Sequence, residues 1–93
     1  GKAFQGTGLN AHCKFLLLDY AFSTLELKRV EFRADAENAR SIAAMKRIGC
    51  TVEGILRSNS TRPDGGRRDS IVLSILAHEW TNGIRNRLRD SLQ

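Results

Sequence analysis

The sequence predicts an α/β domain, and three observations along its 93 residues support that prediction. A glycine-containing loop opens directly into a long apolar stretch of helical periodicity over residues 5–25. A strictly alternating stretch follows at 29–34. A capped helical stretch then leads into two strand-like stretches joined by a strong turn signal. Helices that alternate with strands in this way pack on a sheet in layers.

Length and composition indicate one small globular domain. The chain is 41% hydrophobic and 27% charged, and no apolar stretch approaches the roughly 20 residues that cross a bilayer. The net charge of +5 is compatible with an anionic cofactor, with nucleic acid or with an ordinary basic surface. Cys13 and Cys50 lack metal-ligand spacing, and we expect both to be buried thiols in a reducing cytoplasm.

The loop at residues 5–10 is the first candidate site. Two glycines separated by one residue let the backbone turn tightly and approach a ligand closely. The first N–H groups of the following helix have no partner within the helix and attract an anion. The loop therefore predicts a phosphate-binding site or, alternatively, an ordinary turn into a helix; its residues are Gln5, Gly6, Thr7, Gly8, Leu9 and Asn10.

The first helix is predicted over residues 9–25 and is apolar around most of its circumference. One stripe contains Leu9, Cys13, Leu16, Leu17 and Tyr20, and a second contains Phe15, Leu18 and Phe22. We therefore expect this helix to be buried on two sides. In the strand at 29–34, the alternation directs Val30, Phe32 and Ala34 to one face and the charged residues to the other.

The second helix is predicted over residues 36–48. Asp35 is a suitable N-cap, and Gly49 is placed to end the helix in a left-handed conformation. Ile42, Met45 and Ile48 form its apolar stripe, which leaves Arg40, Lys46 and Arg47 for solvent or a ligand.

A hairpin and a short helix complete the predicted elements. Strands at 51–59 and 67–76 are joined by a turn at 63–66 that contains one proline and two glycines. The tail from residue 78 places Trp80, Ile84, Leu88 and Leu92 at steps of four, which indicates a helix with a narrow apolar stripe.

These motifs, in this order and at these separations, resemble the GCN5-related N-acetyltransferase (GNAT) family. The resemblance is strongest to the subgroup that includes the ribosomal-protein N-terminal acetyltransferases, and it extends from Gln5 to about Trp80. It is carried by the glycine loop, the stretch 34–41 that opens the second helix, the end of that helix at 46–50, and the hairpin.

The resemblance implies a fold and a domain division. The chain would be the carboxy-terminal half of a GNAT acyl-CoA N-acyltransferase fold, in the order loop-α-β-α-β-β-α, with helices packed on a mixed sheet. It would form one partial domain over residues 1–93. Its parts would be the pyrophosphate loop and helix at 5–25, the strand and second motif helix at 29–49, the hairpin at 51–76 and the last helix at 78–93.

The resemblance also implies acetyl-CoA as cosubstrate and no metal. Backbone amides of the loop, residues 5–10, would hold the pyrophosphate, although Ala3 stands where the family usually has Gln or Arg. Arg47 is a further candidate for the coenzyme phosphates, and so is Arg40, since guanidinium groups suit phosphate. Exposed helix arginines are the common alternative.

Two residues near the start of the second helix match family positions. Asn38 would contact the pantetheine arm or the thioester, or alternatively would only cap the helix. Many members protonate the departing thiolate with a tyrosine where this chain has Met45, which has no proton to give. Ser41 matches a serine proposed for that role in the resembling subgroup, and its alternative is a small residue that lets the helix approach the cofactor.

Three functions follow as hypotheses. The first is the coenzyme-binding half of an N-acetyltransferase that acts on a protein amino terminus or a small amine. The second is a catalytically silent CoA-binding or oligomerisation fragment. The third, a basic nucleic-acid binder, is disfavoured because no helix groups Arg, Asn or Gln for base recognition.

The family fold normally has several strands before the glycine loop. We therefore expect the strand leading to that loop to be missing and the strand at 29–34 to have an unpaired edge, which a second copy of the chain could cover.

Overall fold

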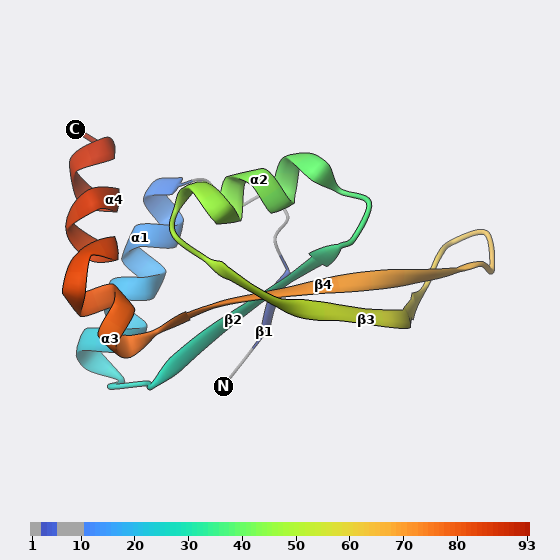
Figure 1. Cartoon of the computed structure of the whole chain (residues 1–93), viewed down its shortest axis with the longest axis horizontal. Helices are drawn as coiled ribbons and strands as arrows, with labels where there is room; N and C mark the ends of the chain where they lie inside the picture. Colours follow the sequence, from blue (N-terminus) through green and yellow to red (C-terminus); the bar gives the residue numbers. More distant parts are fainter. Residues whose placement is uncertain (1–2, 6–10) are drawn as a thin grey trace.

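A computed structural model of the chain describes residues 3–5, for which only the backbone path is given, and residues 11–93. The strands are β1 (Ala3–Gln5), β2 (Arg29–Asp35), β3 (Thr51–Thr61) and β4 (Arg67–Leu76). The helical elements are α1 (Ala11–Asp19), η1 (Tyr20–Thr24), α2 (Ala39–Arg47), α3 (Ala77–Glu79), η2 (Trp80–Ile84) and α4 (Arg85–Ser91), with η1 and η2 of π type. Figure 1 shows their arrangement.

The four strands form one mixed sheet in the order β1-β2-β4-β3. β1 runs parallel to β2 with Ala3 beside Glu31, whereas β4 is antiparallel to both β2 and β3. The predicted element order and mixed sheet are therefore confirmed. Two expectations were wrong: the strand that leads to the glycine loop is present as β1, and β2 has a neighbour on each side.

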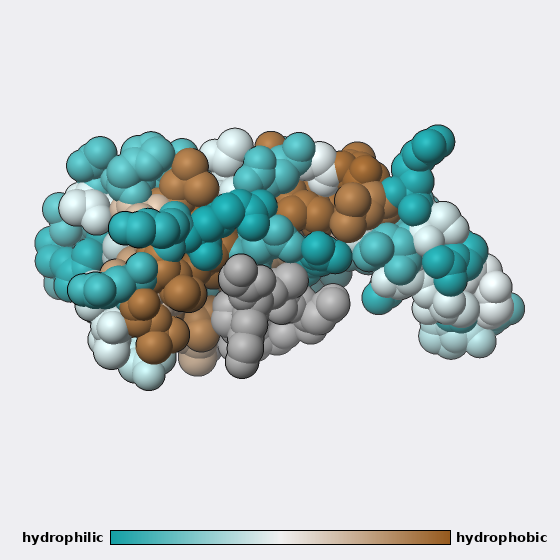
Figure 2. All heavy atoms as spheres, turned by 90° about the horizontal axis from the view of Figure 1, so that it is seen from below, coloured by the Kyte–Doolittle hydropathy of each residue, from teal (hydrophilic) through white to brown (hydrophobic). Residues whose placement is uncertain are grey.

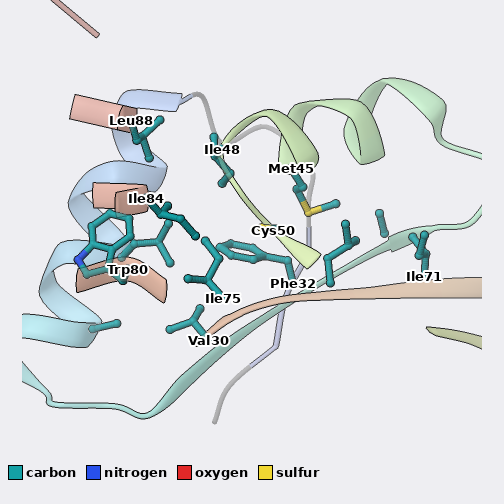
Figure 3. Close-up of a cluster of buried hydrophobic side chains, with 14 residues drawn as sticks. Val30, Phe32, Met45, Ile48, Cys50, Ile71, Ile75, Trp80, Ile84 and Leu88 are labelled. Atoms are coloured by element: carbon teal, nitrogen blue, oxygen red, sulfur yellow. The ribbon is translucent and has the colours of Figure 1, made fainter. Parts of the chain in front are cut away.

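The helices pack on one face of the sheet, as the alternation of β2 predicts. Val30, Phe32 and Ala34 are buried on that face, beside Leu73 and Ile75 of β4. Above them lie Met45 of α2 and Ile48, its C-cap, and beside them Trp80, Ile84 and Leu88 of the C-terminal helices (Figure 3). Full burial of a side chain such as Phe32 contributes roughly 1.5–3 kcal/mol, so this layer holds the sheet and the helices together.

The expectation that α1 is buried on two sides was wrong. Leu18 is fully buried, and Phe15, Leu17 and Phe22 pack against the core, with the Phe15 and Phe22 rings 5.8 and 5.7 Å from that of Trp80. On the outer side, Leu16 and Tyr20 are 60% and 54% exposed. The core therefore uses the stripe that contains Leu18, and Cys13, predicted to be buried, is exposed.

The hairpin and the apolar stripe of the C-terminal helices agree with the predictions made from the sequence. β3 and β4 pair antiparallel, and the turn between them uses Gly65 at a φ of 89°. Trp80, Ile84 and Leu88 are buried, and Leu92 packs against the same core. β3 lies at the edge of the sheet and is exposed along most of its length.

The open face of the sheet carries polar and apolar side chains together. Figure 2, seen from the side opposite α2, shows hydrophobic atoms at the surface on both sides of the grey residues. Among the described residues, the large exposed hydrophobic side chains on the sheet are Val52, Ile55 and Leu56 of β3. Leu16 of α1, Tyr20 of η1 and Leu25 just after η1 are also exposed. Among the described residues, no helix combines the length and apolar character that a membrane crossing requires.

Candidate anion-binding site

A pocket of about 580 Å³ opens where the beginning of α1 meets α2 and α4. Its lining residues are Ala11, Lys14, Arg40, Ala44, Arg47, Ile48, Leu88 and Ser91. Ile48 and Leu88 form part of its apolar wall and point toward the same space near the start of α1 (Figure 3). The volume lies within the range of about 300–1,000 Å³ that is usual for small-molecule sites.

The pocket is strongly cationic, because three of its lining residues are basic. In the part of the chain that the structure describes, no carboxylate oxygen lies within 4.0 Å of a side-chain nitrogen of Lys14, Arg40 or Arg47. Cations that line a concave, partly apolar site without a counter-charge favour an anionic ligand.

Lys14 is the most buried of the three cations, with 4% of its surface exposed. The thiol of Cys50 lies close enough to Lys14 for the two groups to interact electrostatically. Burial raises the pKa of this thiol to about 12; the positive charge of Lys14 opposes the rise, and the negative charge of Glu79 adds to it. The Glu79 carboxylate already accepts a hydrogen bond from the Leu76 N–H at 2.9 Å. Lys14 therefore lies inside the helical layer, close to the thiol.

Helix α2 carries two of the cations, and both of its ends are fixed locally. Asn38 is the N-cap, and its Oδ1 accepts from the Ser41 N–H at 3.1 Å. The prediction that Asp35 is the cap was wrong: its Oδ1 accepts from the Glu37 N–H at 3.0 Å, in the turn that precedes the helix. Gly49 follows the helix with a φ of 111°, which confirms the predicted left-handed end.

Ser41 lies on the inner side of α2 and is only 7% exposed. Met45, one turn later on the same side, is fully buried. Neither Ser41 nor Asn38 lines the cationic pocket. The structure thus shows the capping role of Asn38, and its contact with a ligand stays a prediction, as does the acid role of Ser41.

The predicted phosphate loop is only partly within the described residues. Gln5 ends strand β1, and Gly6, Thr7, Gly8, Leu9 and Asn10 lie outside the described residues. Ala11, which begins α1 directly after them, lines the pocket. The pocket therefore adjoins the place where the loop enters the helix.

Arg47 and Arg40 both line the pocket, and their assignment to coenzyme phosphates stays a prediction. Lys14 was missed by sequence reasoning. The available signal was a single lysine within the apolar first helix, one turn after the helix begins. That signal is weak because lysine stems often lie along apolar surfaces while the amine reaches water.

A second group of charges lies on the open face of the sheet and is internally paired. Glu31 accepts from Arg29 at 2.7 Å and from Arg33 at 2.8 Å, and Glu53 accepts from Arg29 at 3.0 Å and from Ser74 at 2.7 Å. These contacts lower the pKa of Glu31, mainly through hydrogen bonds from Arg29 and Arg33, and that of Glu53, mainly through Ser74 and Arg29. A smaller hollow of about 290 Å³ lies beside them.

No group of three or more His, Cys, Asp or Glu side chains in the described part of the chain is placed to hold a metal ion.

The fold and the pocket together define an α/β domain with a cationic pocket at the start of its first helix. Comparison with known proteins is consistent with this class. The acetyltransferase (GNAT) domain family matches residues 1–51, which is more than half of the chain. The chain therefore belongs to the GNAT acetyltransferase family.

Individual relatives agree with this assignment. YdaF of Bacillus subtilis, provisionally named a ribosomal N-acetyltransferase, is 39% identical over 80 residues. These cover 85% of this chain and 43% of YdaF. Spermidine N(1)-acetyltransferase of Escherichia coli K12 is 31% identical over 77 residues, covering 83% of this chain and 41% of that protein.

The solved structures show the same fold. A GCN5-related N-acetyltransferase from Brucella melitensis superposes with a TM-score of 0.83 at 30% identity, over 89% of this chain and 37% of that one. The chain thus spans less than half the length of the curated relatives it matches. This agrees with the prediction that it corresponds to part of a GNAT fold.

Proposed function

We propose that this chain is the coenzyme-binding part of an N-acetyltransferase that uses acetyl-CoA. The observation that carries the proposal is the pocket at the start of α1, where Lys14, Arg40 and Arg47 present positive charge without a neighbouring carboxylate. In a chain of the GNAT family, such a pocket beside the glycine loop suits the phosphates of CoA.

The proposed roles follow the positions of the residues. Loop residues 5–10 bind the diphosphate through backbone N–H groups, and Arg47 contacts phosphate at the pocket. Asn38 holds α2 by capping it, which leaves the amide nitrogen of its side chain to donate to the pantetheine arm. These roles stay predictions, and so does the cytoplasmic location.

The chemistry is attack of a neutral amine on the thioester carbonyl. The C–N bond forms, the C–S bond breaks, the amine loses a proton, and the departing thiolate gains one. Ser41, at the beginning of α2, is proposed to hydrogen-bond the developing thiolate or relay a proton to it. Met45, one turn later, has no proton to supply.

The acceptor is proposed to be the amine of a protein amino terminus or of a small molecule. The named relatives supply both precedents, since one is named for ribosomal and the other for spermidine acetylation. A second copy of the chain that extends the sheet also stays a prediction. Its position would be the edge strand β3 or β1, because β2 is paired on both sides.

A second candidate function is CoA binding without turnover. The observation that favours it is coverage, because the chain matches less than half the length of its relatives. The remainder of those relatives is where acceptor and base residues would be sought.

The experiment separates these proposals in two steps. Isothermal titration calorimetry of the full chain with acetyl-CoA is expected to show saturable binding, and Arg47→Glu is expected to weaken it by about tenfold or more. Lys46→Glu is the matched control, since Lys46 is the exposed neighbour on α2 that does not line the pocket. Absence of saturable binding would overturn the proposed function.

Release of the CoA thiol with a panel of amines then distinguishes enzyme from silent binder. Steady thiol release above the amine-independent rate supports acetyl transfer. Binding with no release from any amine supports the second candidate. If turnover is present, Ser41→Ala is expected to lower kcat by about tenfold to a hundredfold with little change in the KM for acetyl-CoA. An unchanged kcat would assign Ser41 to packing alone.

A further inference from the structure

We propose that the ion pair between Asp19 and Arg85 holds the C-terminal helix α4 against α1 and so sets the width of the pocket that both helices line. Asp19 and Arg85 are thus positioning residues, because neither of them lines the pocket. The pair acts on a ligand only through the two helices that it joins. The statement about affinity rests on the proposed function, which makes acetyl-CoA the ligand of this pocket.

The pair joins two segments that lie far apart in the sequence. Asp19 is the last residue of α1 and Arg85 is the first residue of α4, and Nε of Arg85 donates to Oδ1 of Asp19 at 2.8 Å. Among the described residues, it is the one ion pair within 4.0 Å that connects two different helices. The others lie on the sheet, between the hairpin and the turn before α2, or within α4.

The side chains around the pair fix its geometry. Ser23 Oγ donates to the same Oδ1 of Asp19 at 3.2 Å, and the guanidinium carbon of Arg85 lies 5.8 Å from the centroid of the Phe15 ring. The hydrogen bond from Arg85 is the main cause that lowers the pKa of Asp19, so this carboxylate is ionised at neutral pH. A guanidinium that is both hydrogen-bonded and stacked on an aromatic ring keeps a defined orientation. The pair is therefore a fixed point for α4.

The backbone before α4 leaves the direction of that helix to its tertiary contacts. α4 follows η2, a π-type segment in which Gly83 has non-helical angles of φ 167° and ψ −35°. A break of this kind interrupts the regular backbone hydrogen bonds that keep two helical pieces in line. On the other side of the contact, α1 continues into η1, which is also of π type. Both helices change their geometry at the pair, so a side-chain link at this point fixes the direction of α4.

The pair and the pocket lie at opposite ends of the same two helices. α1 and α4 lie side by side and run in opposite directions (Figure 1). At the end away from the pair, α1 contributes Ala11 to the pocket and α4 contributes Ser91. Because α4 has 7 residues, Arg85 and Ser91 lie roughly 9 Å apart along its axis. A tilt of about 10° at the pair would therefore move Ser91 by about 1.5 Å, which is enough to disturb the contacts of a bound ligand.

Loss of the pair is expected to change the pocket and not the whole fold. Trp80 and Ile84 keep the beginning of the C-terminal segment packed in the core, so the chain stays folded without the pair. α4 then samples tilted positions, in which Leu88 and Ser91 meet a bound ligand less closely. The expected result is a lower affinity of the pocket for its ligand, with the sheet as stable as before.

Hydrogen exchange of the ligand-free full chain and calorimetric titration with acetyl-CoA test the inference together. Arg85→Met keeps a stem of similar length but removes the charge. We expect exchange within α4 to become about threefold faster or more, exchange within β4 to stay unchanged, and the affinity for acetyl-CoA to fall by about threefold to tenfold. Arg62→Met is the matched control, which should change neither α4 nor the affinity. Its partner Glu37 lies at 3.0 Å, and the Arg62 side chain is 35% exposed, against 38% for Arg85.

Asp19→Asn, which keeps the shape of the side chain, tests the same link from the other helix. If the two residues act as a pair, the double variant Asp19→Asn/Arg85→Met should bind acetyl-CoA no more weakly than Arg85→Met alone. Losses that add up would contradict the inference, because each residue would then act by itself. Should Arg85→Met not fold, Asp19→Asn provides both the exchange and the affinity measurement.

Each alternative result has a separate meaning. Unchanged exchange within α4 of Arg85→Met would overturn the inference. Faster exchange with unchanged affinity for acetyl-CoA would also overturn it while leaving the proposed function in place. An equal loss of affinity in Arg62→Met would overturn it as well, because the effect would then be one of overall charge. Absence of acetyl-CoA binding by the wild type would overturn the proposed function, and the exchange pattern alone would then decide whether the pair holds α4.

Discussion

The cationic pocket and the open face of the sheet carry the same kinds of charge in opposite arrangements. On the sheet face, Arg29 and Arg33 flank Glu31, and Glu53 joins Arg29 to Ser74. At the pocket, Lys14, Arg40 and Arg47 surround a hollow, and no described carboxylate lies within 4.0 Å of them. The difference indicates which region favours an anionic ligand: the arginines on the sheet face are neutralised by neighbouring glutamates, whereas the pocket cations have no described carboxylate partner.

The two regions also differ in how the backbone positions the charges. On the sheet face, β2 sets the positions of Arg29, Glu31 and Arg33, because its strict alternation places every second side chain on that side. Glu53 and Ser74 come from the paired strands β3 and β4. The pocket cations come from α1 and α2, so their relative positions depend on how each helix begins and ends. Four measurements test this comparison, from the largest expected effect to the smallest.

The largest effect is expected at Gly49, which ends α2 beside the pocket wall. A Cβ there would lie 3.0 Å from Cδ1 and Cγ1 of the buried Ile84, and the φ of 111° disfavours an L side chain. Strain of about 1 kcal/mol and overpacking of about 1–3 kcal/mol add up, so Gly49→Ala should lower the free energy of unfolding by about 3 kcal/mol. Denaturant titration measures this.

Gly65 provides the matched control. It has a φ of 89° in the hairpin turn but open space around the added Cβ. Gly65→Ala should cost about 1 kcal/mol, from backbone strain alone. Equal losses in the two variants would show that the close approach of α2 and η2 does not constrain the end of the helix.

The next effect concerns Asn38 at the other end of α2. Asn38→Ala removes the acceptor of the Ser41 N–H and should destabilise the chain by about 1 kcal/mol. Asn38→Asp keeps that acceptor but loses the amide donor, so it should keep most of the stability. A loss of acetyl-CoA affinity in Asn38→Asp would support donor contact. Unchanged affinity would leave Asn38 with capping alone.

A difference in sign is expected between the two charged regions. Lys14→Met removes a buried cation that lacks a carboxylate, so it should raise the free energy of unfolding of the ligand-free chain by about 1 kcal/mol. Arg33→Met leaves Glu31 with one partner and should lower it by up to about 1 kcal/mol. Thermal or denaturant unfolding without ligand gives both values. A lower free energy of unfolding in both variants would contradict the idea that the Lys14 charge has no stabilising partner within the protein.

The smallest effect is a pH dependence from the sheet face. Arg29 and Arg33 lower the pKa of Glu31, whose side chain is 15% exposed. A lowered folded pKa gives stability that is fully present above the unfolded value of about 4.3 and is lost as the pH falls through the folded pKa.

The stability gap between wild type and Glu31→Gln should therefore be under about 1 kcal/mol at pH 7 and should shrink below pH 4. Glu26→Gln controls for loss of an exposed carboxylate outside this group of charges. A gap that stays constant down to pH 2 would mean that the ion pairs do not stabilise the fold.

Local patterns predicted the parts of the fold that depend on neighbouring residues in the sequence. The alternation of β2, the stripe from Ile42 to Ile48 and the turn at 63–66 each have a clear periodicity or turn chemistry, and the structure confirms them. β1 has only three residues, too few for a period to be read. The central position of β2 depends on pairing with β1 and β4, which no local pattern encodes.

The site was harder to predict for a related reason. The first helical segment has two apolar stripes, and packing against the shared core leaves Leu18 inward while Leu16 and Tyr20 face solvent. Once that choice is made, Lys14 is buried and Cys13 is exposed, the reverse of what their hydropathy suggests. Asp35 and Asn38 are both good caps, so sequence alone did not choose between them.

The position of β4 sets the order in which this molecule can be assembled during its synthesis. β4 comes last in sequence among the described strands, yet it is the strand that joins β2 to β3. Until residue 76 has emerged, the two earlier strands have no bridge between them, and the aliphatic side chains of β2 have only part of their cover. The sheet of the nascent chain is therefore completed late, when β4 pairs with β2 and β3. A stall of translation before this strand would leave an intermediate with exposed hydrophobic surface, which is prone to aggregate and is a substrate for chaperones.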